Sequence, residues 1–187
     1  PWGDWADHTL ITLQYLDEDN YSFSVQGRYS SGDTSAVITN NFTVDAVQGP
    51  ALMFYPRAHY SSVGSNITFE IHAEEVSNLT AVQFNVTFDP ELLLITSVSE
   101  GSLFLDFGES IFSYDYNNVT GSLSVVAAAL GGEQASFMGT GVLAVIVVHV
   151  EGSVGTYLQF DGTETFRDPD NNIISISEVV NGRVILE

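Results

Sequence analysis

The sequence predicts an all-β fold, a β-sandwich of the jelly-roll type. Short segments alternate apolar and polar residues along most of the chain, as half-buried strands do. Turn-forming clusters such as SSGD, VGSN and NNVTG separate these segments. No segment keeps a helical period beyond about two turns. Because hydrophobic residues make up 44% of the chain and aromatic residues 12%, we expect a packed core and no general disorder.

The alternation is clearest in residues 66–72 and 82–88. In residues 82–88 every second residue is apolar, so the polar residues between them share the opposite, outward face. These outward residues are Gln83, Asn85 and Thr87. Residues 73–79 are expected to form a helical turn or a loop. Further strands are expected at residues 8–16, 21–30, 35–44, 51–56, 92–99, 111–115, 122–129, 141–150, 156–160, 173–177 and 182–186.

The longest apolar stretch is GVLAVIVVHV, at residues 141–150. We interpret it as a strand buried on both faces, because it is far shorter than the roughly 18 residues that a membrane-spanning helix needs. Within it, His149 is interpreted as a packed residue with its polar atoms satisfied. No basic segment opens the chain, so we expect any secretory signal to have been removed or to lie upstream.

The charge of the chain limits its partners. The formal net charge is −20, with 24 acidic residues, four arginines and no lysine. Such a surface repels phosphate groups, so nucleic acid and anionic membranes are not expected to bind. The same charge suits solubility at high ionic strength, or bound divalent cations. Cysteine is absent, which excludes disulfides, thiol catalysis and Cys-ligated metals.

A domain boundary is predicted near VDAVQGP, giving one domain at residues 1–48 and a second at 49–187. The first supplies only about three strands, which are marginally stable alone. In LQYLDEDNYSFSV, Leu16 and Tyr21 resemble the tyrosine corner of a fibronectin type III or immunoglobulin-like domain. RYSSGDTS then resembles its F–G hairpin and NFTVD its last strand. The resemblance covers only the C-terminal half of such a domain.

The second domain resembles a cohesin module. VGSNITFEI (63–71), AVQFNVTFDPELLLITSVSEG (81–101), GTGVLAVIVVHVEGSVGTYLQF (139–160) and FRDPDNNIISISEVVNGRVIL (166–186) follow the family's order of strands and turns. The resemblance implies a nine-stranded jelly-roll sandwich that binds dockerins, which are calcium-loaded modules of other proteins. It places the contact on one sheet face near 81–88 and 122–129, so Gln83, Asn85 and Thr87 are candidate partner-binding residues.

Five Asn-x-Thr triplets stand out, at Asn41, Asn66, Asn78, Asn85 and Asn118. Chance would give roughly two Asn-x-Ser/Thr triplets for this composition. Alternation on a half-buried strand explains the polar, apolar, polar spacing, but Asn is depleted in strands. The triplets therefore predict N-glycosylation of a secreted chain at these five asparagines. A glycan on Asn85 would cover the face that a dockerin would use.

No motif points to catalysis. The four histidines are scattered, and close acidic pairs are inevitable among 24 acids, so we expect no enzymatic activity and no required cofactor. Asp168, Asp170 and Asn172 copy the first half of a calcium loop. Ile173 stands where such a loop has glycine, and Val179 where it has glutamate. An ordinary turn between strands is the alternative to calcium.

Three functions follow as hypotheses. The first is a non-enzymatic, glycosylated assembly protein at the cell surface, in a layer, scaffold or filament, that binds copies of itself or neighbouring surface proteins, with an edge strand of one subunit completing the next. The second is a cohesin-type dockerin receptor in a scaffoldin. The third is a carbohydrate-binding module using Tyr55, Tyr60, Tyr114 and Tyr116, or Trp2 and Trp5.

Overall fold

The computed structural model describes residue 5 and residues 11–13, 16–17, 19–45, 47–105, 109–130 and 136–187. The chain divides into two compact units, Pro1–Ala46 and Val47–Glu187. Apart from one four-residue helix, α1 (Ser102–Leu105), the regular elements of the described residues are strands. The all-β prediction is therefore confirmed.

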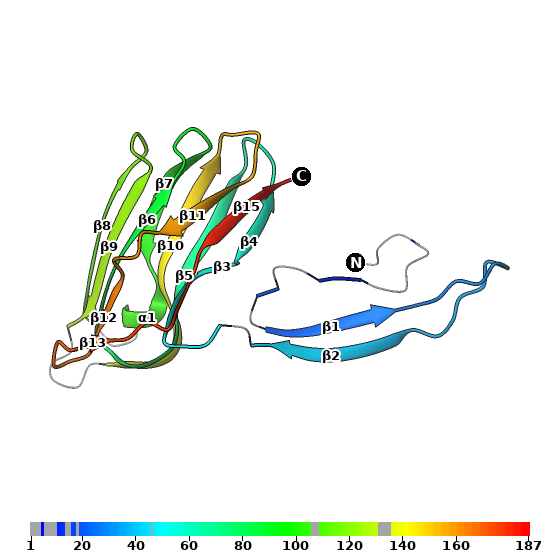
Figure 1. Cartoon of the computed structure of the whole chain (residues 1–187), viewed down its shortest axis with the longest axis horizontal. Coiled ribbons are helices and arrows are strands. Elements are labelled where there is room, and N and C mark those ends of the chain that lie inside the picture. The colour runs from blue at the N-terminus through cyan, green and yellow to red at the C-terminus, as the bar shows by residue number, and fades with distance from the viewer. Residues whose placement is uncertain are drawn as a thin grey trace. The chain divides into compact units, whose positions relative to one another are not determined.

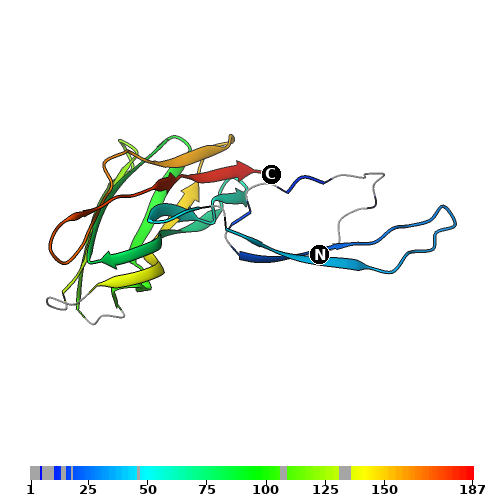
Figure 2. The same ribbon diagram turned by 60° about the horizontal axis from the view of Figure 1, so that its bottom comes forward.

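The first unit holds a β-hairpin. Strand β1 (Asp19–Val25) pairs antiparallel with β2 (Ile38–Val44), and Figures 1 and 2 show the two strands side by side along their length. The hydroxyl of Tyr21 donates to the carbonyl oxygen of Asp17 at 2.9 Å, the bond that a tyrosine corner makes to the backbone just upstream. The strand expected at residues 8–16 lies partly outside the described residues, and residues 11–13 and 16 are not in a strand.

The second unit is a sandwich of two sheets (Figure 1). The smaller sheet has five strands, in the order β14 (Glu178–Val180), β3 (Ala51–Tyr55), β5 (Asn66–Leu79), β10 (Phe137–Val150) and β7 (Leu93–Glu100). The larger sheet follows the order β13 (Ile173–Ile174), β12 (Thr165–Arg167), β6 (Ala81–Phe88), β11 (Thr156–Phe160), β15 (Gly182–Leu186) and β4 (Ala58–Ser61).

Strand β6 is the centre of the larger sheet. One of its edges pairs with β9 (Ser122–Ala129), which in turn pairs with β8 (Ser110–Asn117). The other edge pairs with two successive strands, β11 and β12, so residues 161–164 interrupt the ladder there. Every second side chain of β6 is buried, and among these Phe84 and Val86 are fully buried. The apolar residues of β5, β6 and β10 form the core between the sheets, because each strand turns every second side chain inward.

Three sequence expectations need correction. Residues 73–79 are neither helix nor loop but the end of β5, which stays paired with β10 through register shifts. Glu75 and Asn78 lie in the part of β5 where the register shifts, and they have positive φ angles of +47° and +61°. Strand β10 is longer than expected and is fully buried on one face only, with His149 half-buried on the other. Residues 173–177 form only the two-residue strand β13, and β4, β12 and β14 were not expected.

Candidate binding face

The outward face of the larger sheet is built from β8, β9, β6, β12 and β11. Residues that pair directly across neighbouring strands project from the same face, so the register sorts the outward side chains into rows. The rows hold Asn117, Ser122, Thr87 and Gln159; then Asp115, Ser124 and Asn85; then Ser113, Val126, Gln83 and Thr165; and last Ile111, Ala128, Ala81 and Arg167.

This face is polar in its first two rows and mixed in its last two, where Arg167 and polar groups lie beside apolar side chains. The first two rows carry hydroxyl and amide groups, while the last two expose Val126 and Ile111, at 40% and 47% of their surface. Strands β6 and β9 contain no charged residue, and β8 contains only Asp115. A weakly charged face with hydrogen-bonding groups beside apolar side chains has the composition of a protein interface.

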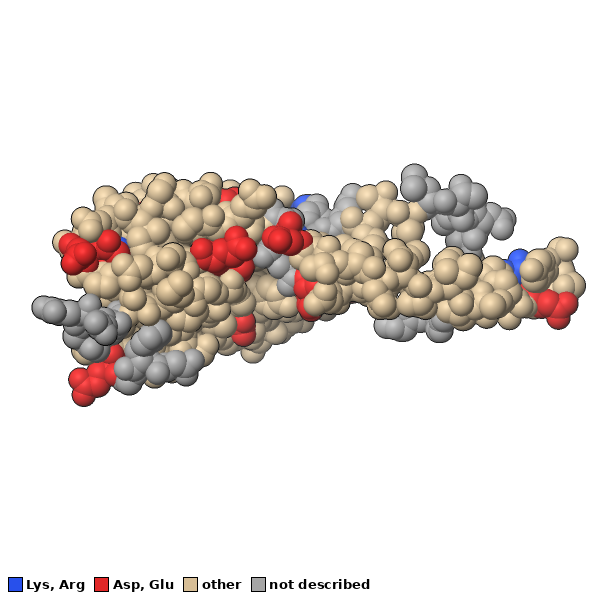
Figure 3. Space-filling model, turned by 90° about the horizontal axis from the view of Figure 1, so that it is seen from below, with Lys and Arg blue, Asp and Glu red and all other residues tan. Residues whose placement is uncertain are grey.

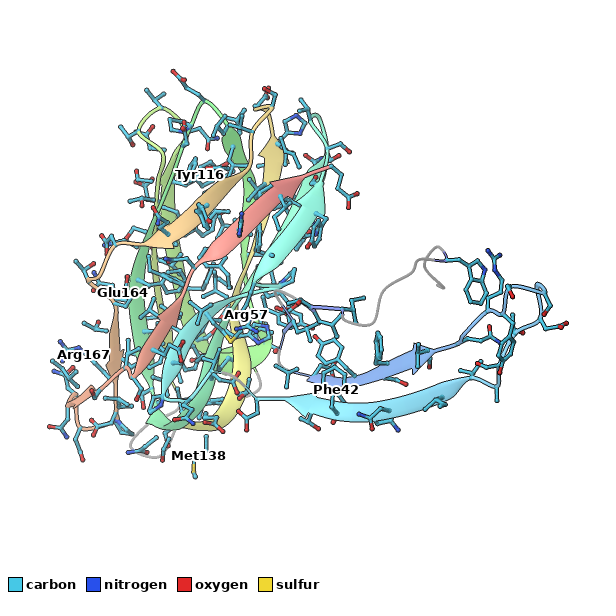
Figure 4. All side chains as sticks on the ribbon, turned by 45° about the vertical axis from the view of Figure 1, so that its right-hand side comes forward. Phe42, Arg57, Tyr116, Met138, Glu164 and Arg167 are labelled. Atoms are coloured by element: carbon cyan, nitrogen blue, oxygen red, sulfur yellow. The ribbon has the colours of Figure 1, made fainter. Side chains whose placement is uncertain are left out.

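Asn85 forms hydrogen bonds with the turn that interrupts the ladder. Its Nδ2 donates to Oδ2 of Asp161 at 3.1 Å and lies 3.0 Å from the hydroxyl oxygen of Thr163. The Thr163 hydroxyl itself donates to Oδ1 of Asp161 at 2.6 Å. This last bond is the main reason why the pKa of Asp161 is lowered, and the bond from Asn85 adds to it. Figure 4 labels Glu164, the residue just before β12, and Arg167, the last residue of β12.

The structure places Gln83, Asn85 and Thr87 side by side on β6, with Gln83 and Thr87 exposed and Asn85 half-buried. The sequence reasoning missed Asp161 and Thr163. The Asp-Gly dipeptide after residue 160 does signal a turn, but only the pairing of β6 with both β11 and β12 brings that turn beside Asn85.

The five triplet asparagines differ in what their side chains do. Asn41, Asn66 and Asn78 are exposed. Asn118 is half-buried, and its amide pairs with the backbone of Ile95: Nδ2 donates to the carbonyl oxygen at 2.9 Å and Oδ1 accepts from the N–H at 2.9 Å. A glycan on Nδ2 of Asn118 would have to disturb this pair, and one on Asn85 the bonds to Asp161 and Thr163.

The loop proposed for calcium is a tight turn between β12 and β13. Both carboxylate oxygens of Asp168 accept bonds from Asn172, from its backbone N–H at 2.7 Å and its Nδ2 at 3.0 Å. These bonds, with that of the side chain first, lower the pKa of Asp168. Arg167 adds a positive charge by donating to the carbonyl oxygen of Asn171. Among the described residues, no group of three His, Asp or Glu side chains is placed to hold a metal ion.

The tyrosines considered for sugar binding do not share one surface. Tyr114 and Tyr116 lie on β8 with nearly parallel rings, 9° apart at a centroid distance of 6.3 Å. Tyr116 is half-buried against the core (Figure 4), which leaves Tyr114 as the exposed ring of the pair. Tyr55 stacks on His72 in the other sheet. Trp2 lies outside the described residues.

Comparison with known proteins identifies the family. A family model for the cohesin domain matches residues 57–186, which is well over half of the chain. The chain belongs to the cohesin family. Cohesins are non-catalytic protein-interaction modules, and the resemblance inferred from the sequence motifs is thereby confirmed. No curated protein matches the chain at a significant level.

Solved cohesins share the fold at low sequence identity. The sixth cohesin of scaffoldin B from Acetivibrio cellulolyticus, solved with a Cel5 dockerin, has a TM-score of 0.63 at 22% identity, covering 75% of this chain and 100% of that one. A non-cellulosomal cohesin from Archaeoglobus fulgidus has a TM-score of 0.60 at 19% identity, covering 73% and 90%. The OlpA cohesin of Clostridium thermocellum, solved in a type I complex with a dockerin, has 0.63 at 19%, covering 73% and 98%.

Proposed function

We propose that this cohesin is an extracellular, non-enzymatic binding module that captures a dockerin-type protein on the outward face of β8, β9 and β6. One observation carries the proposal: within a cohesin fold, this face combines polar rows with exposed Val126 and Ile111 and is almost free of charge. Related folds have been solved with dockerins bound. The triplet asparagines support a secreted chain, and no helix among the described residues is long and apolar enough to cross a membrane.

A matched pair of variants tests the face. Gln83 lies in the middle of the proposed surface, and Thr68 is an exposed residue of β5 in the other sheet. A panel of calcium-loaded dockerins is screened by calorimetry, and the affinity is remeasured for Gln83→Arg and Thr68→Arg. We expect Gln83→Arg to weaken binding at least about tenfold, because a long charged side chain would separate the surfaces, and Thr68→Arg to leave binding unchanged. Absence of binding throughout the panel, or equal loss in both variants, would contradict the proposal.

A structural role, in which copies of this chain or its surface neighbours assemble into a glycosylated layer, scaffold or filament, is the second candidate. A specific observation favours it: none of the described residues from 5 to 45 is buried. A two-stranded hairpin without a core is marginally stable in water and gains stability from a partner. Glycans on exposed Asn41 and Asn66 would be compatible with such an assembly.

A further inference from the structure

Two of the Asn-x-Thr triplets have the same local pattern but different surroundings. Asn66 is the first residue of β5, and Asn85 lies in the middle of β6. In each triplet the apolar middle residue is buried, while the asparagine and the threonine project from the outward face of a sheet. Any difference in the reactivity of these two asparagines therefore comes from the fold around them.

The side chain of Asn66 leaves its amide nitrogen available. Its Oδ1 lies 2.7 Å from Nδ1 of His149, and because an amide oxygen can only accept, this bond uses the oxygen and directs Nδ2 away from the ring. Asn66 and Thr68 are both exposed. Among the residues that the structure describes, neither Nδ2 of Asn66 nor the hydroxyl of Thr68 has a hydrogen-bond partner. Both polar groups of this triplet can therefore contact another molecule.

The backbone of this triplet is also accessible. Among the described strands, β5 pairs with β10 from Asn66 onward, whereas its pairing with β3 ends at Glu70. The preceding turn is exposed at residues 62–64, and a side chain built on Gly64 would meet open space. An enzyme can thus approach Asn66 from the turn and from the unpaired side of the strand.

Asn85 is enclosed where Asn66 is open. Its Nδ2 donates to Oδ2 of Asp161 at 3.1 Å and to the hydroxyl oxygen of Thr163 at 3.0 Å, which engages both of its N–H groups. The hydroxyl of Thr87 donates to the carbonyl oxygen of Gln159 at 3.3 Å. Strand β6 is paired along both edges, with β9 on one and with β11 and β12 on the other. A new bond at Nδ2 of Asn85 would have to replace one of these hydrogen bonds.

We propose that Asn66 is a glycosylation site of the folded chain and that Asn85 is not. The inference rests on the secretion of the chain proposed above. The donor is an oligosaccharide whose anomeric carbon is bonded to a lipid phosphate. Nδ2 of Asn66 bonds to that carbon, the bond from the carbon to the phosphate oxygen breaks with its electron pair on the oxygen, and a base of the transferase takes the proton from Nδ2.

Charge favours Asn66 over Asn85. The chain carries −20, and Figure 3 shows acidic side chains, in red, at several places on the face that it draws. Such groups repel the phosphate of the donor. Residues 58–69 contain no acidic residue, whereas the carboxylate of Asp161 is bonded directly to Nδ2 of Asn85. The phosphate meets less repulsion at Asn66.

This site keeps the sugar away from the proposed dockerin-binding face. Asn66 projects from the outward face of the smaller sheet and Asn85 from that of the larger sheet, with the core between them (Figure 1). A glycan on Asn66 therefore lies on the opposite side of the sandwich from β6, β8 and β9. One chain can then be glycosylated and still bind a dockerin.

The test compares transfer to the folded chain with transfer to peptides. The 187-residue chain, produced in a host that adds no sugar, is given to a single-subunit oligosaccharyltransferase that accepts Asn-x-Thr, with its lipid-linked oligosaccharide. Glycopeptide mass spectrometry follows each asparagine over time. We expect Asn66 to be modified at least about tenfold faster than Asn85, because Asn85 reacts only after its strand opens locally.

Peptides of residues 61–71 and 80–90, each carrying one triplet, are the matched control. They lack the fold, so we expect their two asparagines to be modified at similar rates. The proposal is overturned if the folded chain is unmodified at Asn66, if Asn85 reacts as fast as Asn66, or if the peptides show the same preference as the folded chain.

Dockerin affinity gives a second readout. The chain modified at Asn66 should bind a dockerin within about twofold of the unmodified chain, because the sugar lies on the other sheet. A large loss of affinity would contradict this placement of the glycan. If no dockerin binds, the binding function fails, and the transfer experiment still decides the assignment of Asn66.

Discussion

Asn118 connects two strands that no backbone ladder joins. Its side-chain amide pairs with both the N–H and the carbonyl of Ile95 in β7, an edge strand of the smaller sheet, while Asn118 itself follows β8 of the larger sheet. Edge strands expose unpaired backbone groups to other chains. Asn118 therefore closes part of the β7 edge and fastens the two layers together at the same time.

We expect Asn118→Ala to lower the free energy of unfolding by about 1–3 kcal/mol, because it leaves the part-buried N–H and carbonyl of Ile95 without these partners. Urea unfolding, followed by the far-UV circular dichroism of the backbone, measures the change. Ser97→Ala, at an exposed position of the same strand, is the control and should change stability by less than about 0.5 kcal/mol. Equal stability of Asn118→Ala and the unmodified chain would contradict the edge-closing role.

At the scale of elements, the break between β11 and β12 is the feature that shapes the binding face. It places the Asp161–Thr163 turn beside Asn85, so that an ordinary strand residue becomes part of a three-residue hydrogen-bond cluster. The cluster needs an ionised Asp161, since its carboxylate accepts all the bonds described for it. The geometry of the face is thus coupled to one proton.

Because the pKa of Asp161 is lowered in the folded chain, its contribution to stability is present above the ordinary aspartate pKa and is lost as pH falls through the lower, folded value. We expect Thr163→Val to raise the pKa of Asp161 most, because the Thr163 hydroxyl is the largest cause of the shift, and Asn85→Ala to raise it less. Titration of the carboxyl carbon by NMR measures both. A larger effect in Asn85→Ala would show that the amide, and not the hydroxyl, controls the carboxylate.

At the scale of the whole molecule, the distribution of charge distinguishes the face proposed to bind from the rest of the surface. The chain carries 24 acidic residues, yet β6 and β9 carry none and the hairpin strands carry one. The proposed dockerin-binding face is therefore a weakly charged area on a strongly acidic molecule. Acidic residues elsewhere keep the chain soluble and oppose association through other faces.

Added salt should strengthen the proposed self-association. The repulsion between two −20 chains is screened over about 10 Å at 0.1 M ionic strength, so copies can approach one another more closely. We expect the dissociation constant for association of two copies to fall several-fold between about 0.05 and 0.5 M sodium chloride. Sedimentation equilibrium measures it. Weakening of the association by salt would mean that ion pairs hold the copies together.

The alternation of apolar and polar residues was enough to predict the all-β class and the outward positions of β6, because inward and outward side chains repeat every two residues in a strand. The ordered motifs were enough to indicate the cohesin family. Residues 73–79 were misread because EEVSN lacks an alternation of its own; pairing with β10 holds it in β5.

Only the tertiary structure decided which distant residues meet. The Asn118 side chain bonds to backbone groups of β7, and the Asn85 side chain bonds to the side chains of Asp161 and Thr163. Neither contact can be predicted from the local sequence. The sequence by itself determined which side of a clearly alternating strand such as β6 faces the core, since that depends on neighbours two residues apart. The order of strands in the sheets, which depends on pairing between segments more than a hundred residues apart, such as β3 with β14 and β4 with β15, had to come from the folded chain.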